Sequence, residues 1–355
     1  MVDANRNGAD GAGGGPGVEV VDVLIIGGGP TGLFTAFYAG LRGASAAIVD
    51  SLEQLGGAVT AMYPEKYIYD VGGFPAVLGK DLIANLTEQA GQFNPRVHLA
   101  ERAEKLERIP DDEVFRLETD KGVHYGRTVI ICAGVGAFAP KKLVLENLAE
   151  FEQSGKVVYF VTRNEDFRGQ RLLIVGGGDS AVDWALTLEP IASKITLIHR
   201  SDNFRAHAKS VEQMLNSSVD VHTHCEVDQL HGEGGVLRAA TFRHNKTKEL
   251  TTVEVDAAIM SIGFVADLGP LKSWGLEVQK NQLVADPLTM ATNIPGIWAA
   301  GDIIVHPTKF KLIATGFHEA ITAVNHAVHH LNPKQRLAAA HSTNLDLPMM
   351  KVQGG

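Results

Sequence analysis

Two stretches decide the fold: Val20–Gly32 reads VVDVLIIGGGPTG, and Arg171–Ala181 reads RLLIVGGGDSA. In each stretch, a continuous run of β-branched residues and leucine ends in a glycine-rich turn. Such a run is typical of a parallel strand covered on both faces, and the residues after each turn have the pattern of a helix. Each stretch therefore predicts the start of a strand–helix–strand unit, and the chain contains this unit twice.

The glycines of the first turn suit a bound pyrophosphate. Gly27 allows the tight turn, Gly29 lets the backbone approach the phosphates, and Gly32 lets helix and strand pack closely. The second turn offers the equivalent set, Gly176, Gly178 and Ala181. Free N–H groups and the helix dipole at the start of each following helix would hold the anion. The turns predict two dinucleotide sites, with an ordinary strand-to-helix turn as the alternative at either place.

The end of the second strand of each unit distinguishes the two sites. Asp50 and His199 stand at the same distance along the chain from the first glycine of their units. A carboxylate there accepts hydrogen bonds from ribose hydroxyls, whereas His199, Arg200 and the nearby Arg205 would pair with a 2′-phosphate. The first site therefore favours FAD and the second NADP(H). A solvated strand end is the alternative interpretation of His199 and Arg200.

The composition argues against several classes of function. The chain has 355 residues, 45% of them hydrophobic, and a formal net charge of −9, so a sequence-independent grip on nucleic acid is not expected. We find no apolar run of membrane-spanning length and no signal-peptide pattern, which predicts a cytoplasmic protein. The two cysteines, Cys132 and Cys225, lie far apart and support neither a disulfide framework nor a sulfur-ligated metal.

The order of the segments predicts an α/β fold with two Rossmann-like dinucleotide-binding domains, the second inserted into the first. The stretches 105–129 and 221–255 predict a small antiparallel β insertion in each domain. We expect a flexible Gly-rich tail at 1–17, an FAD-binding domain at 18–135 and 288–332, an NADP(H)-binding domain at 136–287 and a C-terminal extension at 333–355. The hinge between the domains is expected near Gly136 and Asp286.

Further motifs carry a resemblance to a known superfamily. Asp50 is followed by Gln54-Leu55-Gly56-Gly57, and Gly301-Asp302 stands near the end of the chain. With the two glycine turns, the chain resembles the two-dinucleotide-binding flavoproteins from about Val20 to Ala327. The resemblance implies that Asp302 holds the ribityl chain of the flavin and that a helix starting near Thr315 points at the isoalloxazine ring. A plain helix cap is the alternative role for Asp302.

Within this superfamily the chain lacks the chemistry of thioredoxin reductase, whose cysteine pair would fall at Tyr159–Thr162. It resembles more closely the thioredoxin-reductase-like ferredoxin-NADP reductases, which are homodimeric FAD enzymes without cysteine chemistry. The motifs that carry this resemblance are Met62-Tyr63-Pro64-Glu65-Lys66, Tyr69-Asp70-Val71, Gly136-Ala137-Phe138, GGGDSAVDWAL at 176–186, and Ile262-Gly263-Phe264 followed by Leu268-Gly269-Pro270-Leu271.

The resemblance assigns roles to individual residues. Tyr63 would stack on one face of the flavin, and His341 of the partner subunit's C-terminal extension would cover the other; no acid or base residue is proposed. The remaining FAD contacts would come from Gly27, Gly29, Thr31, Gly32, Asp50, Gln54, Ala103, Phe138, Asp302, Thr315 and Thr343. NADP(H) would be held by Gly176, Gly178, Asp179, Ser180, Ala181, His199, Arg200 and Arg205. Ala103 and Phe138 have plain packing roles as alternatives.

The chain departs from the family pattern at two positions. Ser201 stands where a second arginine often follows His-Arg, which leaves Arg200 and Arg205 to hold the 2′-phosphate. Ala58 replaces the usual glutamine after Leu-Gly-Gly, and a modest change in flavin affinity or potential is expected.

The expected reaction is hydride exchange between NADPH and FAD, coupled to one-electron exchange with ferredoxin or flavodoxin. An acidic ferredoxin would need a local basic patch, for which the candidates are Lys141, Lys142, Lys309 and Lys311. Two other functions remain open: an NAD(P)H-dependent reductase of a small disulfide or quinone, and a flavin-binding sensor without turnover. No metal site is expected, because a solvated or interfacial helix face explains His326, His329 and His330 better than metal ligation.

Overall fold

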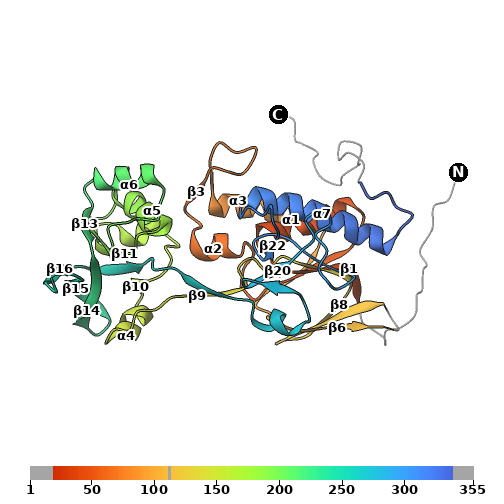
Figure 1. Ribbon diagram of the computed structural model, residues 1–355, viewed down its shortest axis with the longest axis horizontal. Coiled ribbons are helices and arrows are strands. Elements are labelled where there is room, and N and C mark those ends of the chain that lie inside the picture. Colours follow the sequence, from red (N-terminus) through yellow and green to blue (C-terminus); the bar gives the residue numbers. More distant parts are fainter. Residues whose placement is uncertain (1–18, 111–112, 339–355) are drawn as a thin grey trace.

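The computed structural model describes residues 19–110 and 113–338. The expected tail at 1–17 and most of the expected extension, including His341 and Thr343, lie outside the described residues. Figure 1 shows two bodies of unequal size, with strand β9 running between them. No helix within the described ranges is long and apolar enough to cross a membrane.

The larger body is built on a seven-stranded sheet of order β5-β2-β1-β8-β7-β6, with the seventh strand, β21, paired to β8. Strands β5, β2, β1, β8 and β21 run parallel, whereas β6, β7 and β8 form an antiparallel meander. The bounds are β1 (Val20–Ile26), β2 (Ala46–Val49), β5 (Arg96–His98), β6 (Ala103–Ile109), β7 (Val114–Thr119), β8 (Val123–Ile131) and β21 (Ile297–Ala299).

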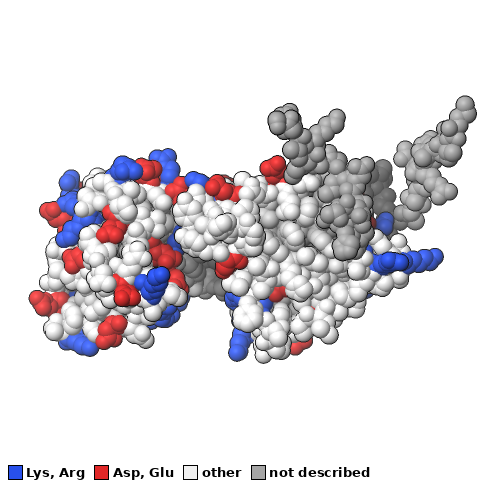
Figure 2. Space-filling model, turned by 90° about the horizontal axis from the view of Figure 1, so that it is seen from above, with Lys and Arg blue, Asp and Glu red and all other residues white. Residues whose placement is uncertain are grey.

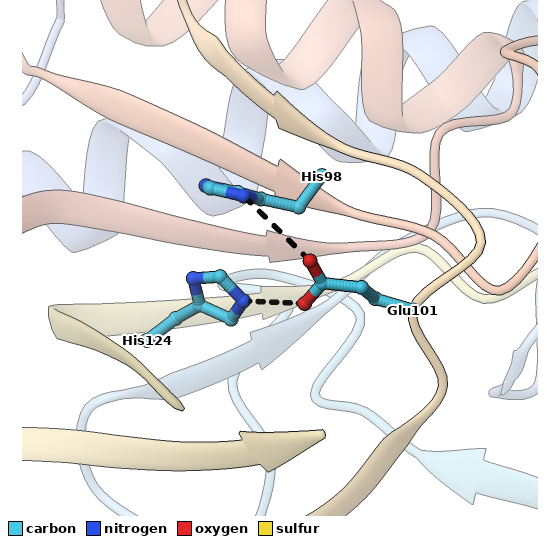
Figure 3. Close-up of side chains that lie close together, drawn as sticks. All are labelled: His98, Glu101 and His124. Atoms are coloured by element: carbon cyan, nitrogen blue, oxygen red, sulfur yellow. Dashed lines mark hydrogen bonds and ion pairs between the residues drawn. The ribbon is translucent and has the colours of Figure 1, made fainter. Parts of the chain in front are cut away.

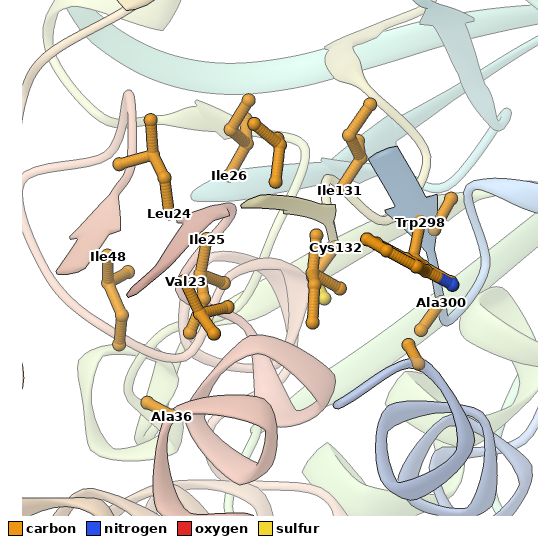
Figure 4. Close-up of a cluster of buried hydrophobic side chains, with 14 of the residues drawn as sticks. Val23, Leu24, Ile25, Ile26, Ala36, Ile48, Ile131, Cys132, Trp298 and Ala300 are labelled. Carbon is orange, nitrogen blue, oxygen red and sulfur yellow. The ribbon is translucent and has the colours of Figure 1, made fainter. Parts of the chain in front are cut away.

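Three helices cover one face of this sheet (Figure 1). They are α1 (Pro30–Leu41), α3 (Gly79–Gly91) and α7 (Ile313–Leu331). Strands β2 and β21 are buried along their whole length and β1 is buried from Val23 to Ile26, and Leu24, Ile25 and Ile131 are fully buried in the core shown in Figure 4. Burying each such side chain contributes about 1.5–3 kcal/mol to stability. A buried strand therefore consists largely of apolar residues, and such runs can be recognised in the sequence.

The smaller body contains a second parallel sheet of order β10-β17-β11-β12-β13. Its strands are β10 (Val157–Val158), β11 (Arg171–Val175), β12 (Lys194–His199), β13 (Asp220–Thr223) and β17 (Ala257–Met260). A separate antiparallel sheet joins β14 (Cys225–Glu233), β15 (Val236–His244) and β16 (Leu250–Glu254). The helices are α4 (Leu148–Gln153), α5 (Asp179–Leu188) and α6 (Ala208–Leu215), with a 3-10 turn at Asn164–Phe167. The expected fold class is confirmed.

Two antiparallel strands, β9 (Ala137–Pro140) and β18 (Phe264–Asp267), connect the bodies. The chain therefore leaves the first body beside Gly136, as expected, but returns to it well before Asp286. The 3-10 turn Gly269–Ser273 follows, and Leu271 and Trp274 already belong to the core of the larger body. The boundary expected at 287 is thus corrected to β18, because the segment behind it buries its apolar side chains in the first core.

Short elements complete the larger body. Helix α2 (Ala58–Met62) follows the Leu55-Gly56-Gly57 turn, and a small hairpin joins β3 (Tyr67–Ile68) to β4 (Val77–Leu78). A small three-stranded sheet contains β19 (Val278–Gln279), β20 (Gln282–Val284) and β22 (Ile304–Val305). Together, α2 and the β3–β4 hairpin bring the Met62–Lys66 motif to the edge of the larger body that faces the smaller one (Figure 1).

Candidate active site

The first glycine turn has the geometry of a phosphate cradle. Gly27 has a φ of 106°, and a Cβ there would collide with the carbonyl oxygen of Cys132, while a Cβ on Gly32 would collide with the carbonyl oxygen of Gly27. A Cβ on Gly29 would meet only the Cα of Gly57, at 3.9 Å, so the space in front of Gly29 is open. Helix α1 starts there without a side-chain cap, which leaves its first N–H groups free for an anion.

Asp50 lies at the end of β2 and organises this turn. Its Oδ2 accepts a hydrogen bond from the Gly28 N–H at 2.6 Å and its Oδ1 from the Leu52 N–H at 2.8 Å. Burial raises the pKa of this carboxyl, although both hydrogen bonds oppose the shift. Each carboxylate oxygen has a second lone pair that a ribose hydroxyl can use. Ala103 begins β6 just beyond the point where the Glu101 N–H bonds to the Asp50 carbonyl oxygen, whereas Gln54 is exposed.

Thr31 connects α1 to the Gly301-Asp302 motif. Its hydroxyl lies where a Cβ on Gly301 or on Gly316 would collide with it, so the two glycines allow this close approach. Helix α7 begins at Ile313, two residues before the expected start at Thr315. The Thr315 hydroxyl lies 2.7 Å from the Phe310 carbonyl oxygen and 2.9 Å from that of Leu312. The Thr315 hydroxyl thus fixes the start of the helix.

Tyr63 lies between the two bodies. It follows α2 directly and packs against the hydrophobic cores of both bodies. Burial, with the nearby negative charges of Asp302 and Asp70, raises the pKa of Tyr63 to about 12, so the ring stays neutral at physiological pH. Tyr63 lines a cleft of about 500 Å³ together with residues of both bodies: Lys66, Tyr67, Ile68, Tyr69, Asp70, Asp179, Ser180, Asp183, Lys311, Leu312 and Ile313.

The second turn repeats the geometry of the first. Gly176 has a φ of 147°, and a Cβ there would collide with the carbonyl oxygen of Ser261, whereas a Cβ on Gly178 would meet nothing within 4 Å. Helix α5 also starts without a side-chain cap. Asp179 and Ser180 are exposed at this end, while Ala181 is buried against the strands. The open space and free N–H groups again fit a pyrophosphate.

His199 differs from what a phosphate ligand requires. Its residue is only 7% exposed, and its ring lies against Gly177, where any side chain on that glycine would collide with it. Burial lowers the pKa of His199, so the ring is neutral at pH 7. Arg200 and Arg205 are exposed, and the Arg205 N–H bonds to the Gly177 carbonyl oxygen at 2.8 Å. Of the three predicted ligands of the 2′-phosphate, Arg200 and Arg205 are exposed, whereas His199 is buried.

Phe138 lies in β9, where its backbone is opposite Ala266 of β18. It is therefore part of the connection between the bodies, as expected for a residue at the crossover. Of the predicted site residues, the structure brings Tyr63, Asp179 and Ser180 to the cleft between the bodies, whereas Thr31 lies beside Gly301 and Asp50 beside Gly28.

Lys309 is not part of an exposed patch, which corrects its expected role. Its ammonium lies 2.8 Å from both carboxylate oxygens of Glu319, and the two side chains are 5% and 4% exposed. Glu319 Oε2 also accepts a hydrogen bond from the Gly301 N–H at 2.8 Å, and His306 Nε2 lies 3.6 Å from Oε1. This buried network fixes the loop that carries Asp302.

A His–Glu–His group lies on the larger body (Figure 3). His124 Nε2 is 2.7 Å from Glu101 Oε2, and His98 Nδ1 is 4.0 Å from Glu101 Oε1. Their ligand atoms lie within 4.8 Å of one another, a spacing wider than a bound metal would require. By contrast, His329 bonds to the Gln335 carbonyl oxygen and His330 packs edge-on against Trp298, both as parts of the fold.

Comparison with known proteins identifies the class. Residues 21–329 match the family model described as pyridine nucleotide-disulphide oxidoreductase. The fold is shared with thioredoxin reductase from T. acidophilum at a TM-score of 0.75 and 22% identity, covering 89% of this chain and 99% of the other. For thioredoxin reductase from Lactococcus lactis (FR conformation) the TM-score is 0.74 at 23% identity, covering 88% and 99%. The chain belongs to the pyridine nucleotide-disulphide oxidoreductase family.

Sequence relatives narrow the class. The chain is 50% identical to the ferredoxin–NADP reductase of Halalkalibacterium halodurans and 49% identical to ferredoxin–NADP reductase 2 of Shouchella clausii. In both cases the match covers 92% of this chain and 98% of the relative. Within its class, the chain belongs to the ferredoxin–NADP reductase family, which confirms the resemblance seen in the sequence. Cys132 and Cys225 are both buried and unpaired, in keeping with a member that lacks a redox cysteine pair.

Proposed function

We propose that this chain is a ferredoxin–NADP reductase that holds FAD on its larger body and NADP(H) on its smaller body. FAD supplies the conversion between a two-electron hydride and two one-electron transfers. The protein's own residues bind, orient and shield the two dinucleotides. Because the reacting atoms belong to the dinucleotides, no acid or base residue is required.

One observation carries the proposal. The uncapped N-terminus of α5 and Tyr63 line the same cleft, and Gly29 of the first glycine turn lies beside Gly57, at the start of the helix that Tyr63 follows. A dinucleotide on each turn would therefore direct its reactive ring toward the same space. Tyr63 stands between the two, where it would stack on the flavin and has to move aside for the nicotinamide.

The partner is proposed to be an acidic ferredoxin or flavodoxin that docks beside this cleft. Lys311 lines the cleft, and Lys141 and Lys142 lie at the end of β9, all three exposed. Lys142 is held by Glu152 at 2.7 Å, so Lys141 and Lys311 carry the less compensated charges. Figure 2 shows acidic and basic side chains mixed over the smaller body in the view from above. A few local lysines, and not a large basic field, would therefore steer the partner.

The proposal includes two finer features: a homodimer and a cytoplasmic location. In the dimer, His341 and Thr343 of the C-terminal extension would complete the flavin site of the partner subunit. Light scattering behind a sizing column tests the dimer directly, and a monomer would remove the shared site.

Anaerobic stopped-flow absorbance of the yellow protein tests the function. NADPH should bleach the flavin band near 450 nm within the dead time or the first seconds, and oxidised ferredoxin should then restore it. Turnover that needs only a small disulfide or quinone would point to a different reductase. A flavin that neither NADPH nor NADH can bleach would point to a sensor.

A further inference from the structure

We propose that Lys246 is a third cationic group for the 2′-phosphate of NADPH, beside Arg200 and Arg205, with His224 holding its ammonium in place. The inference rests on the proposed function and adds a specificity-determining residue to the NADP(H) site. Lys246 lies in the turn between β15 and β16, far along the chain from the glycine turn and its arginines.

Both bodies have the same chain path after the third parallel strand. In the larger body β5 ends at Val97-His98, and Ala100 follows with a φ of 53°; in the smaller body Val221-His222 is followed by His224 with a φ of 55°. In the larger body this left-handed residue leads the chain back beside the ribose-end residue, because the Glu101 N–H bonds to the Asp50 carbonyl oxygen. The repeat places His224 beside the corresponding end of β12.

The hairpin turns that follow are also equivalent. In the larger body the turn between β7 and β8 returns to the chain after β5, with the Asp120 N–H bonded to the Arg102 carbonyl oxygen at 3.1 Å. In the smaller body the Asn245 N–H bonds to the His224 carbonyl oxygen at 2.6 Å. The Asn245 side chain also donates a hydrogen bond from its Nδ2 to the Arg200 carbonyl oxygen, at 3.3 Å. The residue next to Asn245 is Lys246, which is therefore tied to the backbone of a phosphate-binding arginine.

The ammonium of Lys246 is already oriented. Its Nζ lies 3.2 Å from His224 Nε2, and since an ammonium can only donate, the ring nitrogen accepts. The same ring nitrogen lies 3.4 Å from Asp202 Oδ2, a carboxylate on a side chain that is 75% exposed, and while it accepts from Lys246 it donates no hydrogen bond to that carboxylate. Asp202 is the nearby negative charge, and its exposure lets it turn toward water when a phosphate arrives.

The position also accounts for Ser201. The Ser201 hydroxyl lies 3.1 Å from His199 Nε2, so this side chain turns inward toward the buried ring. His199 itself is buried and neutral at pH 7, as described above. The two sequence neighbours of Arg200, His199 and Ser201, therefore carry no positive charge. Lys246 restores a third cation from a different element.

The test compares NADPH with NADH in the purified, FAD-loaded enzyme, using ferricyanide as a one-electron acceptor. In Lys246→Gln we expect KM for NADPH to rise about five- to tenfold while kcat changes little and the parameters for NADH stay the same. Inhibition by 2′,5′-ADP should weaken by a similar factor, and inhibition by 5′-AMP should not. Lys246→Arg should retain most of the NADPH affinity.

The matched control is Lys248→Gln, which removes an exposed lysine from the same turn. This control substitution should leave the ratio of kcat/KM for NADPH to kcat/KM for NADH unchanged. Equal effects of the two substitutions, equal losses with NADPH and NADH, or an unaltered response to 2′,5′-ADP in Lys246→Gln would each overturn the role of Lys246. Failure of the wild-type enzyme to oxidise NADPH at all would instead overturn the proposed function.

Discussion

At the level of single residues, the second glycine turn contains two glycines with different requirements. Gly178→Ala adds a Cβ into open space, whereas Gly176→Ala places one against the Ser261 carbonyl oxygen at a φ of 147°. Gly178→Ala should keep the wild-type melting temperature but raise KM for NADPH at least about tenfold, because the new methyl occupies the phosphate space. Gly176→Ala should instead lose about 2 kcal/mol or more of stability.

Thermal melts and NADPH kinetics of both variants check this prediction. Gly29→Ala is the matched variant at the first turn, since it also meets only distant atoms. It should weaken FAD retention and leave KM for NADPH unchanged. Normal NADPH binding by Gly178→Ala would contradict a pyrophosphate site at this turn.

Residue roles followed from the sequence where the chemistry is local. Gly27 and Gly176 could be identified because a strand followed directly by a helix forces a specific turn. That the His199 and Lys309 side chains are buried could not be predicted from the sequence. The burial of His199 depends on its contact with Gly177, and the burial of Lys309 depends on its ion pair with Glu319. Ring burial under a glycine and a lysine paired inside the core leave no periodic pattern in the neighbouring residues.

At the level of elements, the Lys309–Glu319 pair joins the loop after β22 to helix α7. Lys309→Met should leave an uncompensated carboxylate among apolar groups and cost about 3 kcal/mol, with faster loss of FAD because Gly301 and Asp302 are released. In the double variant Lys309→Met/Glu319→Gln, the amide oxygen can still accept from the Gly301 N–H. Urea denaturation should therefore show the double variant to be more stable than Lys309→Met alone.

His98 on β5 and His124 on β8 belong to the His–Glu–His group, and this group should make the stability of the protein depend on pH. Burial, and then the proximity of His124, lower the pKa of His98. The unfolded chain therefore binds this proton more readily, so the stability contribution is complete above about pH 6.5 and is lost as the pH falls below it. His98→Gln should flatten the decrease in melting temperature between about pH 7.5 and pH 5.5. His318→Gln, at an exposed position of α7, should keep the wild-type slope.

The elements themselves were predictable to different degrees. Strands β1 and β11 and helices α1 and α5 form where the glycine turns indicated them. The start of α7 lies before Thr315 because the Thr315 hydroxyl bonds to carbonyl groups behind it, a capping interaction that needs the preceding loop to fold back. The return crossing at β18 was missed because Leu271 and Trp274 have no pattern that says which of two cores they enter.

At the level of the whole molecule, the order of two nucleotide units predicted two bodies, but not how they contact. Lys66 Nζ lies 3.0 Å from Asp183 Oδ2 and 4.7 Å from the centre of the Trp184 ring. Glu65 Oε2 accepts a hydrogen bond from the Asn164 N–H at 2.7 Å. The Met62–Lys66 motif thus connects the bodies through side chains whose partners lie about a hundred residues away, a distance at which no local pattern operates.

This contact predicts how fast the flavin accepts electrons. The Lys66–Asp183 pair joins the bodies in the arrangement in which Tyr63 packs against both cores. We expect this arrangement to open before a nicotinamide reaches the flavin. Asp183 is 43% exposed, so the pair contributes at most about 1 kcal/mol, equivalent to about a fivefold change in population. Asp183→Asn should therefore speed flavin reduction by NADPH about two- to fivefold in stopped-flow experiments.

Salt provides the control for this prediction. Added salt screens a partly exposed ion pair. At saturating NADPH, where changes in KM have no effect, salt should therefore speed flavin reduction in the wild type and have less effect in Asp183→Asn. Asp220→Asn, which alters an exposed carboxylate on the same body away from Lys66, should behave as the wild type. Slower flavin reduction in Asp183→Asn would contradict this prediction. It would mean that hydride passes from NADPH to FAD while the two bodies stay in contact, with only Tyr63 moving aside.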